Sequence, residues 1–209
     1  MEYKHIKINS LQFNSEVDPF TIKRYQLFLK YFSCHQKTIL DFGCNTGRGG
    51  AVLRSVCTDR TIIGADIVKE RLEKIPTGIY NDIIDLSKDS LLDTIDNADI
   101  IVSGEVVEHI PFKDLIEYLI IFYDIIKENG LLLLTTPNPD AFLVKMGRDS
   151  VIKDPTHINI MKRQFLRTIL LKLGFKSVEI KGSGKAVRYF GENFPLFNIY
   201  GSYLIIARK

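Results

Sequence analysis

Carboxylates and imidazoles, the side chains suited to acid–base chemistry and to holding metal ions, come together in the segment EVVEH at residues 105–109. Glu105 precedes Glu108 by three residues and His109 by four, so a helical turn would place all three groups on one side. A further imidazole, His157, follows much later in the segment DPTHINI. Converging carboxylates and imidazoles suit a hard divalent cation, and a histidine among them also suits a general base. We therefore expect His109, Glu108 and His157 to be catalytic.

A glycine-rich turn, DFGCNTGRGG at residues 41–50, follows the first strand-like segment and opens a helix. Gly43 and Gly47 can adopt a positive φ and let the backbone approach a ligand, while the helix N-terminus offers free N–H donors. A doubly wound sheet binds its ligand at this place. Outside that context, the same turn would be no more than a connection from strand to helix.

Two aspartates indicate the kind of ligand. Asp66 ends the second strand-like segment, where a carboxylate accepts hydrogen bonds from both hydroxyls of an adenosine ribose. Asp41 directly precedes the glycines, and its negative charge disfavours a dinucleotide pyrophosphate at close range. A ligand with an amine or a sulfonium suits that charge better. The alternative is that Asp41 only caps the backbone of the loop.

Short apolar runs alternate with helical patterns along the chain. The runs, at residues 38–43, 61–67, 78–83, 98–103 and 130–137, are typical of strands buried on both faces. Helical patterns lie between them, begin after Asp18 and return from about residue 161 to Gly174. The final runs, KSVEIK and SYLIIARK, are separated by an irregular stretch at 182–201 that is too short for a crossover helix, which favours a hairpin. The sequence therefore predicts a doubly wound, mostly parallel α/β sheet.

The aromatic residues of this irregular stretch have two interpretations. They either line an acceptor cavity or, more often in proteins, pack the final hairpin. These residues are Tyr189, Phe190, Phe194, Phe197 and Tyr200.

The composition is that of one globular domain: of 209 residues 45% are hydrophobic and 25% charged, and the net charge is +3. The basic residues are dispersed, which argues against an obligate nucleic-acid binder and remains compatible with an anionic substrate. The longest apolar stretch is broken by Glu117 and Asp124, and the charged N-terminus lacks the apolar run of a signal peptide. The three cysteines form no CxxC pair. We expect a cytoplasmic protein with reduced thiols and no membrane insertion.

Five motifs, LDFGCNTGRGG, GADI, YNDIIDL, ADIIVSGEVVEHIP and KENGLLLLTTPNP, resemble in this order the motif series of class I S-adenosylmethionine-dependent methyltransferases. The resemblance spans about residues 38–175 and implies a Rossmann-like sheet of seven strands with an antiparallel last strand. It implies a single domain, 1–209, made of an N-terminal helical cap (1–37), a cofactor-binding core (38–175) and a C-terminal hairpin (176–209).

The same resemblance implies which residues bind S-adenosylmethionine, all of them near the ends of the first four strands. Asn45 stands where the family usually has glycine, and asparagine tolerates a left-handed φ better than most residues. The implied positions are Asp41, Gly43 and Gly47 for the methionine part, with Cys44 and Asn45 in the same turn, Asp66 for the ribose, Asp82 for the adenine amino group, Ile67 and Ile83 for the faces of the ring, and Ser103 to Glu105 closing the pocket.

The pattern ExxEH with a later histidine resembles the metal-binding sets of ubiquinone-pathway O-methyltransferases and of small-RNA 3′-terminal 2′-O-methyltransferases. This resemblance implies Glu105, Glu108, His109 and His157 as ligands of Mg²⁺ or Mn²⁺, which lowers the pKa of an acceptor hydroxyl. The EH pair also occurs in the superfamily without a metal, and His109 then orients the acceptor or acts as a general base. Both alternatives remain open.

TTPNP and the PTHINI segment resemble small methyltransferases associated with surface glycans, so the expected acceptor is a sugar hydroxyl of a glycan or glycoconjugate precursor. The alternatives are a phenolic or quinone-type metabolite and the 3′ end of RNA, against which the dispersed charge counts. A protein of another class, a non-catalytic module that only binds S-adenosylmethionine, is a further alternative. The polar cluster at 105–109 argues against it, because such a module needs no catalytic side chains. The sequence indicates no oligomeric state.

Overall fold

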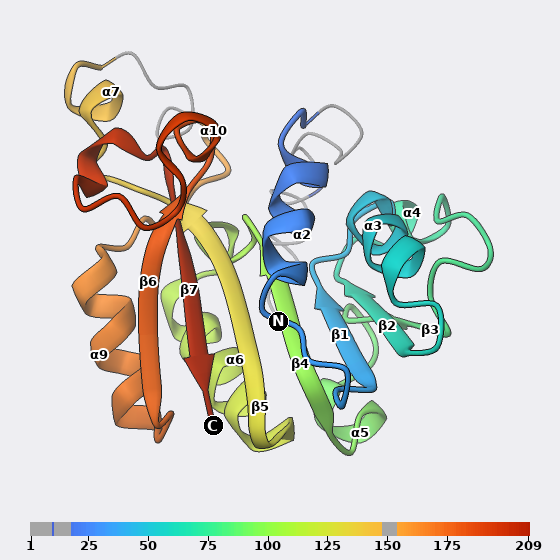
Figure 1. Ribbon diagram of the computed structural model, residues 1–209. Helices are drawn as coiled ribbons and strands as arrows, with labels where there is room; N and C mark the ends of the chain where they lie inside the picture. Colours follow the sequence, from blue (N-terminus) through green and yellow to red (C-terminus); the bar gives the residue numbers. More distant parts are fainter. Residues whose placement is uncertain (1–9, 11–17, 148–153) are drawn as a thin grey trace.

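The computed structural model describes residues 10, 18–147 and 154–209. Its centre is one seven-stranded sheet with the strand order β3-β2-β1-β4-β5-β7-β6 (Figure 1). The strands are β1 (Thr38–Phe42), β2 (Thr61–Asp66), β3 (Asp82–Asp85), β4 (Ala98–Gly104), β5 (Ile126–Pro137), β6 (Ser177–Ser183) and β7 (Ser202–Arg208).

All neighbouring strands are parallel except those that pair with β7, which runs antiparallel to both β5 and β6. The expected fold class, a mostly parallel doubly wound sheet with a reversed last strand, is confirmed. Strand order reverses at β1, which lies between β2 and β4. Such a reversal leaves a crevice outside the carboxyl ends of the strands.

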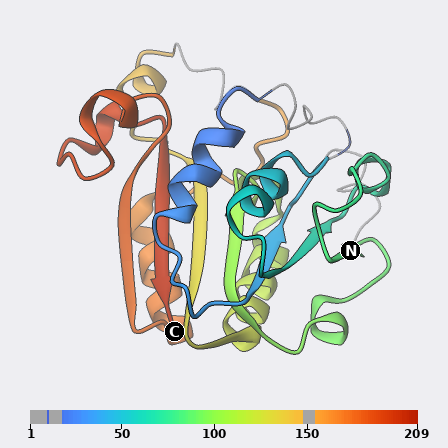
Figure 2. The same cartoon turned by 45° about the vertical axis from the view of Figure 1, so that its right-hand side comes forward.

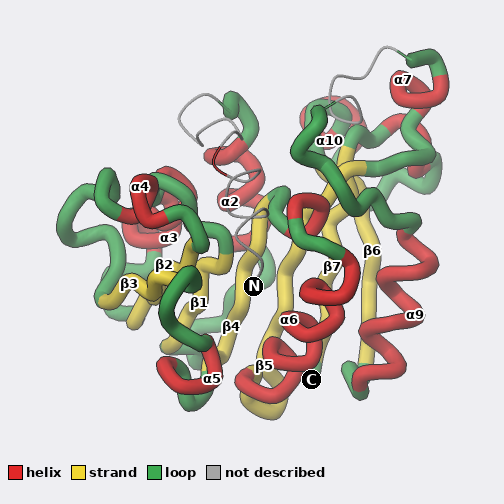
Figure 3. The backbone as a smooth tube through the Cα atoms, turned by 180° about the vertical axis from the view of Figure 1, so that it is seen from behind, coloured by secondary structure: helices red, strands yellow, loops and turns green. Residues whose placement is uncertain are grey.

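Helices cover both faces of the sheet (Figures 2 and 3). One apolar layer joins α2 (Thr21–Leu29) and α3 (Arg48–Val56) to the sheet, and another joins α5 (Leu91–Thr94), α6 (Phe112–Ile125) and α9 (Arg163–Leu173) to its opposite face. Strands buried on both sides are mostly apolar, which explains the apolar runs within β1, β4 and β5. The shorter elements are α4 (Lys69–Leu72), η1 (Val107–His109), α7 (Phe142–Lys145), α10 (Val187–Phe190) and η2 (Phe197–Ile199).

Two expected boundaries were wrong. The third strand covers Asp82–Asp85 rather than residues 78–83, because Gly78 turns with a φ of 86° and Tyr80 points into the layer beneath α3. The helix expected directly after Asp18 begins at Thr21, and its N-cap residue is Phe20 rather than Asp18. The Asp18 carboxylate fixes the turn before the helix, where it accepts hydrogen bonds from the Phe20 N–H and the Thr21 hydroxyl, both at 2.9 Å.

The final pair of strands is the antiparallel hairpin that the sequence predicts, with β6 and β7 in register from Ser177 opposite Arg208 to Ser183 opposite Ser202. Its connection contains α10 and η2. The cysteines Cys34, Cys44 and Cys57 are free thiols. Within the described ranges, no helix has the length and apolar character needed to cross a membrane.

Candidate active site

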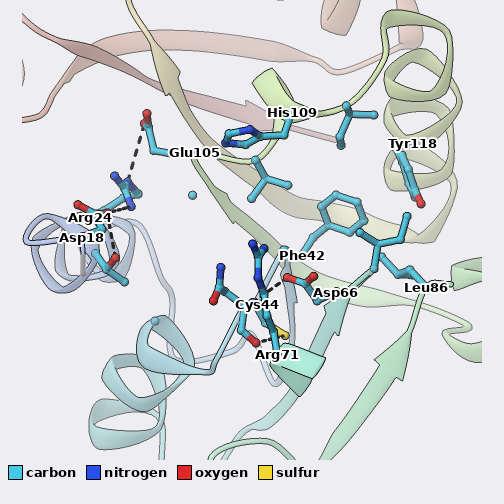
Figure 4. Close-up of a pocket in the computed structure, with 18 of the residues that line it drawn as sticks. Asp18, Arg24, Phe42, Cys44, Asp66, Arg71, Leu86, Glu105, His109 and Tyr118 are labelled. Atoms are coloured by element: carbon cyan, nitrogen blue, oxygen red, sulfur yellow. Dashed lines mark hydrogen bonds and ion pairs between the residues drawn. The ribbon is translucent and has the colours of Figure 1, made fainter. Parts of the chain in front are cut away.

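A cavity opens at the carboxyl ends of β1, β2 and β4, where the strand order reverses (Figure 4). Its wall includes Gly43, Cys44 and Asn45 from the glycine turn and Asp66 with Ile67 from the end of β2. Gly104 and Glu105 after β4 close the other side. The structure thus brings the three segments expected to hold a cofactor to one cavity.

The glycine turn takes this shape because three of its residues, Gly43, Asn45 and Gly47, have a left-handed backbone. Gly43 has a φ of 75°, and a Cβ there would collide with the side chain of Val106. Asn45 has a φ of 53°, the conformation that asparagine accepts more readily than most residues. The N–H of Gly43 donates to the Ala65 carbonyl at 2.8 Å, which ties the turn to β2.

Asp66 is 6% exposed, and its carboxylate faces the cavity between the turn and Arg71 (Figure 4). Its two oxygens accept hydrogen bonds from the N–H groups of Asn45 at 2.8 Å and Val68 at 2.9 Å. Burial raises the pKa of Asp66, and these donors together with Arg71 oppose the rise. Each oxygen keeps a further lone pair, so the fixed carboxylate can accept from a vicinal diol.

Helix α2 forms the side of the cavity that the sequence did not predict. Thr21, Arg24 and Tyr25 line it, and Arg24 reaches between Asp18, at 3.0 Å, and Glu105, at 3.8 Å (Figure 4). The signal for this face was present, because residues three and four positions apart share one side of a helix. What the spacing cannot show is which cavity that side faces.

Asp41 does not line the cavity wall. It is fully buried behind the turn, where Tyr25 and Tyr80 donate hydrogen bonds to its two oxygens at 2.5 Å and 2.6 Å. Burial raises the pKa of Asp41 to about 6 in spite of these donors, and the nearby charge of Asp66 adds to the rise. Among the described residues, the donors to its carboxylate are these two tyrosine hydroxyls, so the alternative role of capping the loop backbone is not seen there.

Four other expected cofactor residues also lie off the wall, judged among the described residues that form it. Gly47 is the N-cap residue directly before α3, with a φ of 85°, and Ser103 is fully buried in β4. Asp82 and Ile83 are exposed near the start of β3, at the end far from the cavity. The shift of β3 along the sequence explains this, since it brings Asp85 level with Asp66 and places Leu86 on the wall instead.

The expected catalytic residues come together beside the cavity. Ligand atoms of Glu108, His109 and His157 lie within 4.8 Å of one another, and the two imidazole rings meet edge to face at 4.7 Å between centroids. Glu108 is fully buried and accepts one hydrogen bond, from the Thr136 hydroxyl at 3.2 Å. Among the described atoms, Glu108 Oε1 and His157 Nδ1 have no hydrogen-bond partner.

The segment 154–159 is hydrogen-bonded to this cluster. The Nδ1 of His109 lies 3.0 Å from the Thr156 carbonyl, and the Asn159 N–H donates to the Glu108 carbonyl at 2.9 Å. Burial, together with the neighbouring His157, lowers the pKa of His109 to about 4. Burial also raises the pKa of Glu108 well above its ordinary value, with the charge of Glu105 contributing.

Glu105 stands apart from this cluster. Its φ is 58°, and its carboxylate lies 3.8 Å from Arg24 Nε and 3.4 Å from the Ser202 hydroxyl. The helical turn expected over residues 105–109 is a 3-10 helix that starts only at Val107, so Glu105 points to another side than Glu108. The structure therefore unites three of the four residues that were expected to hold a metal.

Comparison with known proteins gives one family and a set of similar folds. The family model described as a methyltransferase domain matches residues 13–180. No curated protein matches the chain.

Among solved structures, an S-adenosylmethionine-dependent methyltransferase from Archaeoglobus fulgidus has a TM-score of 0.71 at 23% identity, covering 100% of both chains. One from Thermotoga maritima, described as a possible histamine N-methyltransferase, has a TM-score of 0.68 at 16% identity over 90% of this chain and 88% of its own. The small RNA methyltransferase HEN1 has a TM-score of 0.66 at 23% identity over 94% of this chain and 26% of its own. Such identities show a shared fold alone.

Proposed function

The chain belongs to the methyltransferase domain family, and from that premise we propose that it transfers a methyl group from S-adenosylmethionine to a sugar hydroxyl of a glycan or glycoconjugate precursor. The observation that carries the choice of a hydroxyl is the buried cluster of Glu108, His109 and His157. An alkyl hydroxyl is a poor nucleophile at neutral pH and needs a base or a cation beside it.

We assign the cofactor to the cavity at the carboxyl ends of β1, β2 and β4. Asp66 accepts the ribose hydroxyls, because it is the acid that faces the cavity from the end of β2. Gly43 and Asn45 let the backbone approach the methionine part, and Ile67 with Leu86 supplies apolar surface for the adenine. Arg24 and Tyr25 bring α2 over the same ligand. Asp41 lies behind the cavity wall and acts indirectly, because its hydrogen bond with the Tyr25 hydroxyl fixes the position of Tyr25.

A divalent cation fits the cluster. A buried carboxylate without a cation is costly, and Glu108 has one oxygen without a hydrogen-bond partner among the described atoms. His109 directs Nδ1 to a carbonyl, which leaves Nε2 as the ligand atom, and His157 contributes the third group. Mg²⁺ or Mn²⁺ bound there would lower the pKa of the acceptor hydroxyl. Glu105 is a ligand only if its side chain leaves Arg24.

The same geometry also supports a route without a metal. The Thr156 carbonyl accepts from His109 Nδ1 in the tautomer that leaves Nε2 unprotonated, and the pKa of His109 near 4 keeps the ring neutral at neutral pH. A neutral imidazole beside the acceptor can take its proton as the methyl group arrives. Treatment with a chelator separates the two routes.

Methylation of the 2′-hydroxyl at an RNA 3′ end is the second candidate. It is favoured by the similarity of the fold to the small RNA methyltransferase HEN1 and by the ExxEH pattern with its later histidine. A terminal ribose, like many sugars, offers two neighbouring hydroxyls. The experiment that decides is incubation with methyl-labelled S-adenosylmethionine and a panel of sugars, phenols and RNA oligonucleotides. Label in sugars supports the first proposal, label in RNA supports the second, and label in phenols alone contradicts both.

A further inference from the structure

A second cavity, of about 1070 Å³, adjoins the cofactor cavity. Arg24 and Glu105 line both, so the two spaces meet at this pair. The walls of the second cavity come from α2 on one side and from α10 with the loop before it on the other, and both helices lie at the same end of the sheet (Figure 1). The acceptor must enter from a space that reaches the cofactor, and this cavity does.

The walls of this cavity are strongly cationic. Among the residues that the structure describes, five basic residues line it against a single acid, Glu105. Arg24 and Lys30 have carboxylate partners in Asp18, Glu105 and Glu192. The other basic residues are Lys23, Lys185 and Arg188, and no carboxylate among the described residues lies within ion-pair distance of them.

These cations gather from distant parts of the sequence. Lys23 lies on α2, whereas Lys185 in the loop before α10 and Arg188 in α10 come more than 150 residues later. The dispersed charge of the sequence thus becomes concentrated on two walls that face one cavity. Lysine and arginine side chains without a carboxylate in ion-pair distance suit the binding of a multiply charged anion.

The cavity also offers a flat apolar surface beside its charges. Tyr189 is 74% exposed, and Leu143, which also lines the cavity, is 56% exposed. An exposed aromatic ring next to cations suits a sugar or base that carries a phosphate. The other aromatics of the stretch are divided: Tyr200 is buried and donates to the Gly191 carbonyl, while Phe190 and Phe194 pack on each other at 5.2 Å.

We propose that this cavity binds a phosphate group of the acceptor, held by Lys23, Lys185 and Arg188, so that the hydroxyl to be methylated lies toward Glu105. The inference rests on the proposed function and narrows its acceptor to a phosphate-bearing one. Two sources share this chemistry, a nucleotide-linked sugar and the backbone of an RNA strand. The neutral sugar surface of a finished glycan does not match the walls.

The test measures binding without turnover. Isothermal titration calorimetry with uridine diphosphate and with a short single-stranded oligouridylate, both in the presence of S-adenosylhomocysteine, should show binding that weakens as the salt concentration rises. The double variant Lys185→Gln, Arg188→Gln should bind the same probes at least tenfold more weakly, with an unchanged affinity for S-adenosylhomocysteine. Lys172→Gln, an exposed lysine on α9, is the matched control and should bind them as the wild type does.

Each outcome bears on the inference. Binding of uridine diphosphate indicates a nucleotide-linked source, and binding of the oligomer alone indicates a strand. Absence of binding by both probes, or equal binding by wild type and double variant, overturns the inference. If the phosphate site fails this test but the protein methylates uncharged sugars, the proposed function still holds. If the probes bind but no acceptor is methylated, the phosphate site holds and the proposed function is contradicted.

Discussion

The hydroxyl of Tyr25 donates a 2.5 Å hydrogen bond to Asp41, which joins α2 to β1 directly behind the cofactor cavity. Tyr80 donates to the other oxygen of the same carboxylate, so one buried acid holds side chains from two segments of the chain. The ring of Tyr25 forms part of the cavity wall. The position of this wall therefore depends on a polar contact in the interior.

Replacing Tyr25 by phenylalanine should test that dependence. The variant leaves a fully buried carboxylate oxygen without its donor, and we expect the free energy of unfolding to fall by about 1–3 kcal/mol in urea denaturation. Affinity for S-adenosylmethionine should fall as well. Tyr189→Phe removes a hydroxyl from a largely exposed ring and serves as the control. Equal stability of the Tyr25 variant and the wild type would contradict this role of the hydrogen bond.

Asp41 should make stability depend on pH. Its pKa is about 6 in the folded chain against 3.8 ordinarily, so between these values the unfolded chain releases a proton that the folded chain retains. The contribution of Asp41 to the free energy of unfolding is therefore greatest below pH 4 and is lost as the pH rises to 6, by about 3 kcal/mol in total. Asp41→Asn should abolish this part of the profile. Parallel profiles of wild type and variant, from urea denaturation at each pH without cofactor, would show that Asp41 does not titrate in this way.

Asp66→Ala should weaken binding of S-adenosylmethionine. The ribose hydroxyls would lie beside an apolar wall without their acceptor, at a cost of about 1–3 kcal/mol measured by calorimetry. Asp82→Ala is the matched control, because this aspartate is exposed outside the cavity, and its affinity should equal that of the wild type. The reverse result, a loss only in Asp82→Ala, would place the cofactor elsewhere.

Ligand specificity gives an independent check of the cavity. S-adenosylmethionine and S-adenosylhomocysteine should raise the melting temperature by mass action, and NAD should not. The carboxylate of Asp66 lines the cavity beside the glycine turn, and its negative charge disfavours a pyrophosphate there. Stabilisation by NAD alone would contradict the assignment of the cofactor.

The buried cluster should be essential by either of its two routes. If it holds a cation, EDTA abolishes methyl transfer, Mg²⁺ or Mn²⁺ restores it, and Glu108→Gln is inactive while still binding S-adenosylmethionine. If His109 is a base without a metal, EDTA has no effect, and His109→Ala lowers the rate about 10²–10⁴-fold.

An exposed acid on α6 provides the control for these variants: Glu117→Gln should keep full activity. Full activity in both Glu108→Gln and His109→Ala would remove the cluster from the mechanism altogether.

The sequence predicts the sheet well because its signal is local. Strands β1, β2 and β4 contain short apolar runs, and their parallel pairing follows from the alternation with helices. The third strand was displaced because Tyr80 has the apolar character of a strand residue, whereas its hydroxyl is used to reach Asp41. Asp82, which the family resemblance implied for the adenine amino group, lies at the start of the observed strand and away from the cavity.

The site was predictable where it follows strand ends and not where it depends on distant contacts. Asp66 ends a strand, so its place in the cavity follows from the topology alone. The separation of Glu105 from Glu108 depends on a backbone kink and on Arg24, some 80 residues earlier in the chain. The spacing of residues along the chain cannot predict an ion pair between such distant positions. The face of α2 toward the cavity escaped prediction for the same reason.

The left-handed backbone of Glu105 has a consequence for how this position can vary. Asn129, with a φ of 64°, also has a positive φ, but asparagine tolerates it; a glutamate pays about 1–2 kcal/mol for this conformation. Glycine would relieve the strain and remove the carboxylate that lies between both cavities. At residue 105, folding stability therefore favours glycine, whereas the function of the site favours the glutamate carboxylate. A screen for thermostable variants should find glycine there, and these variants should have lower activity.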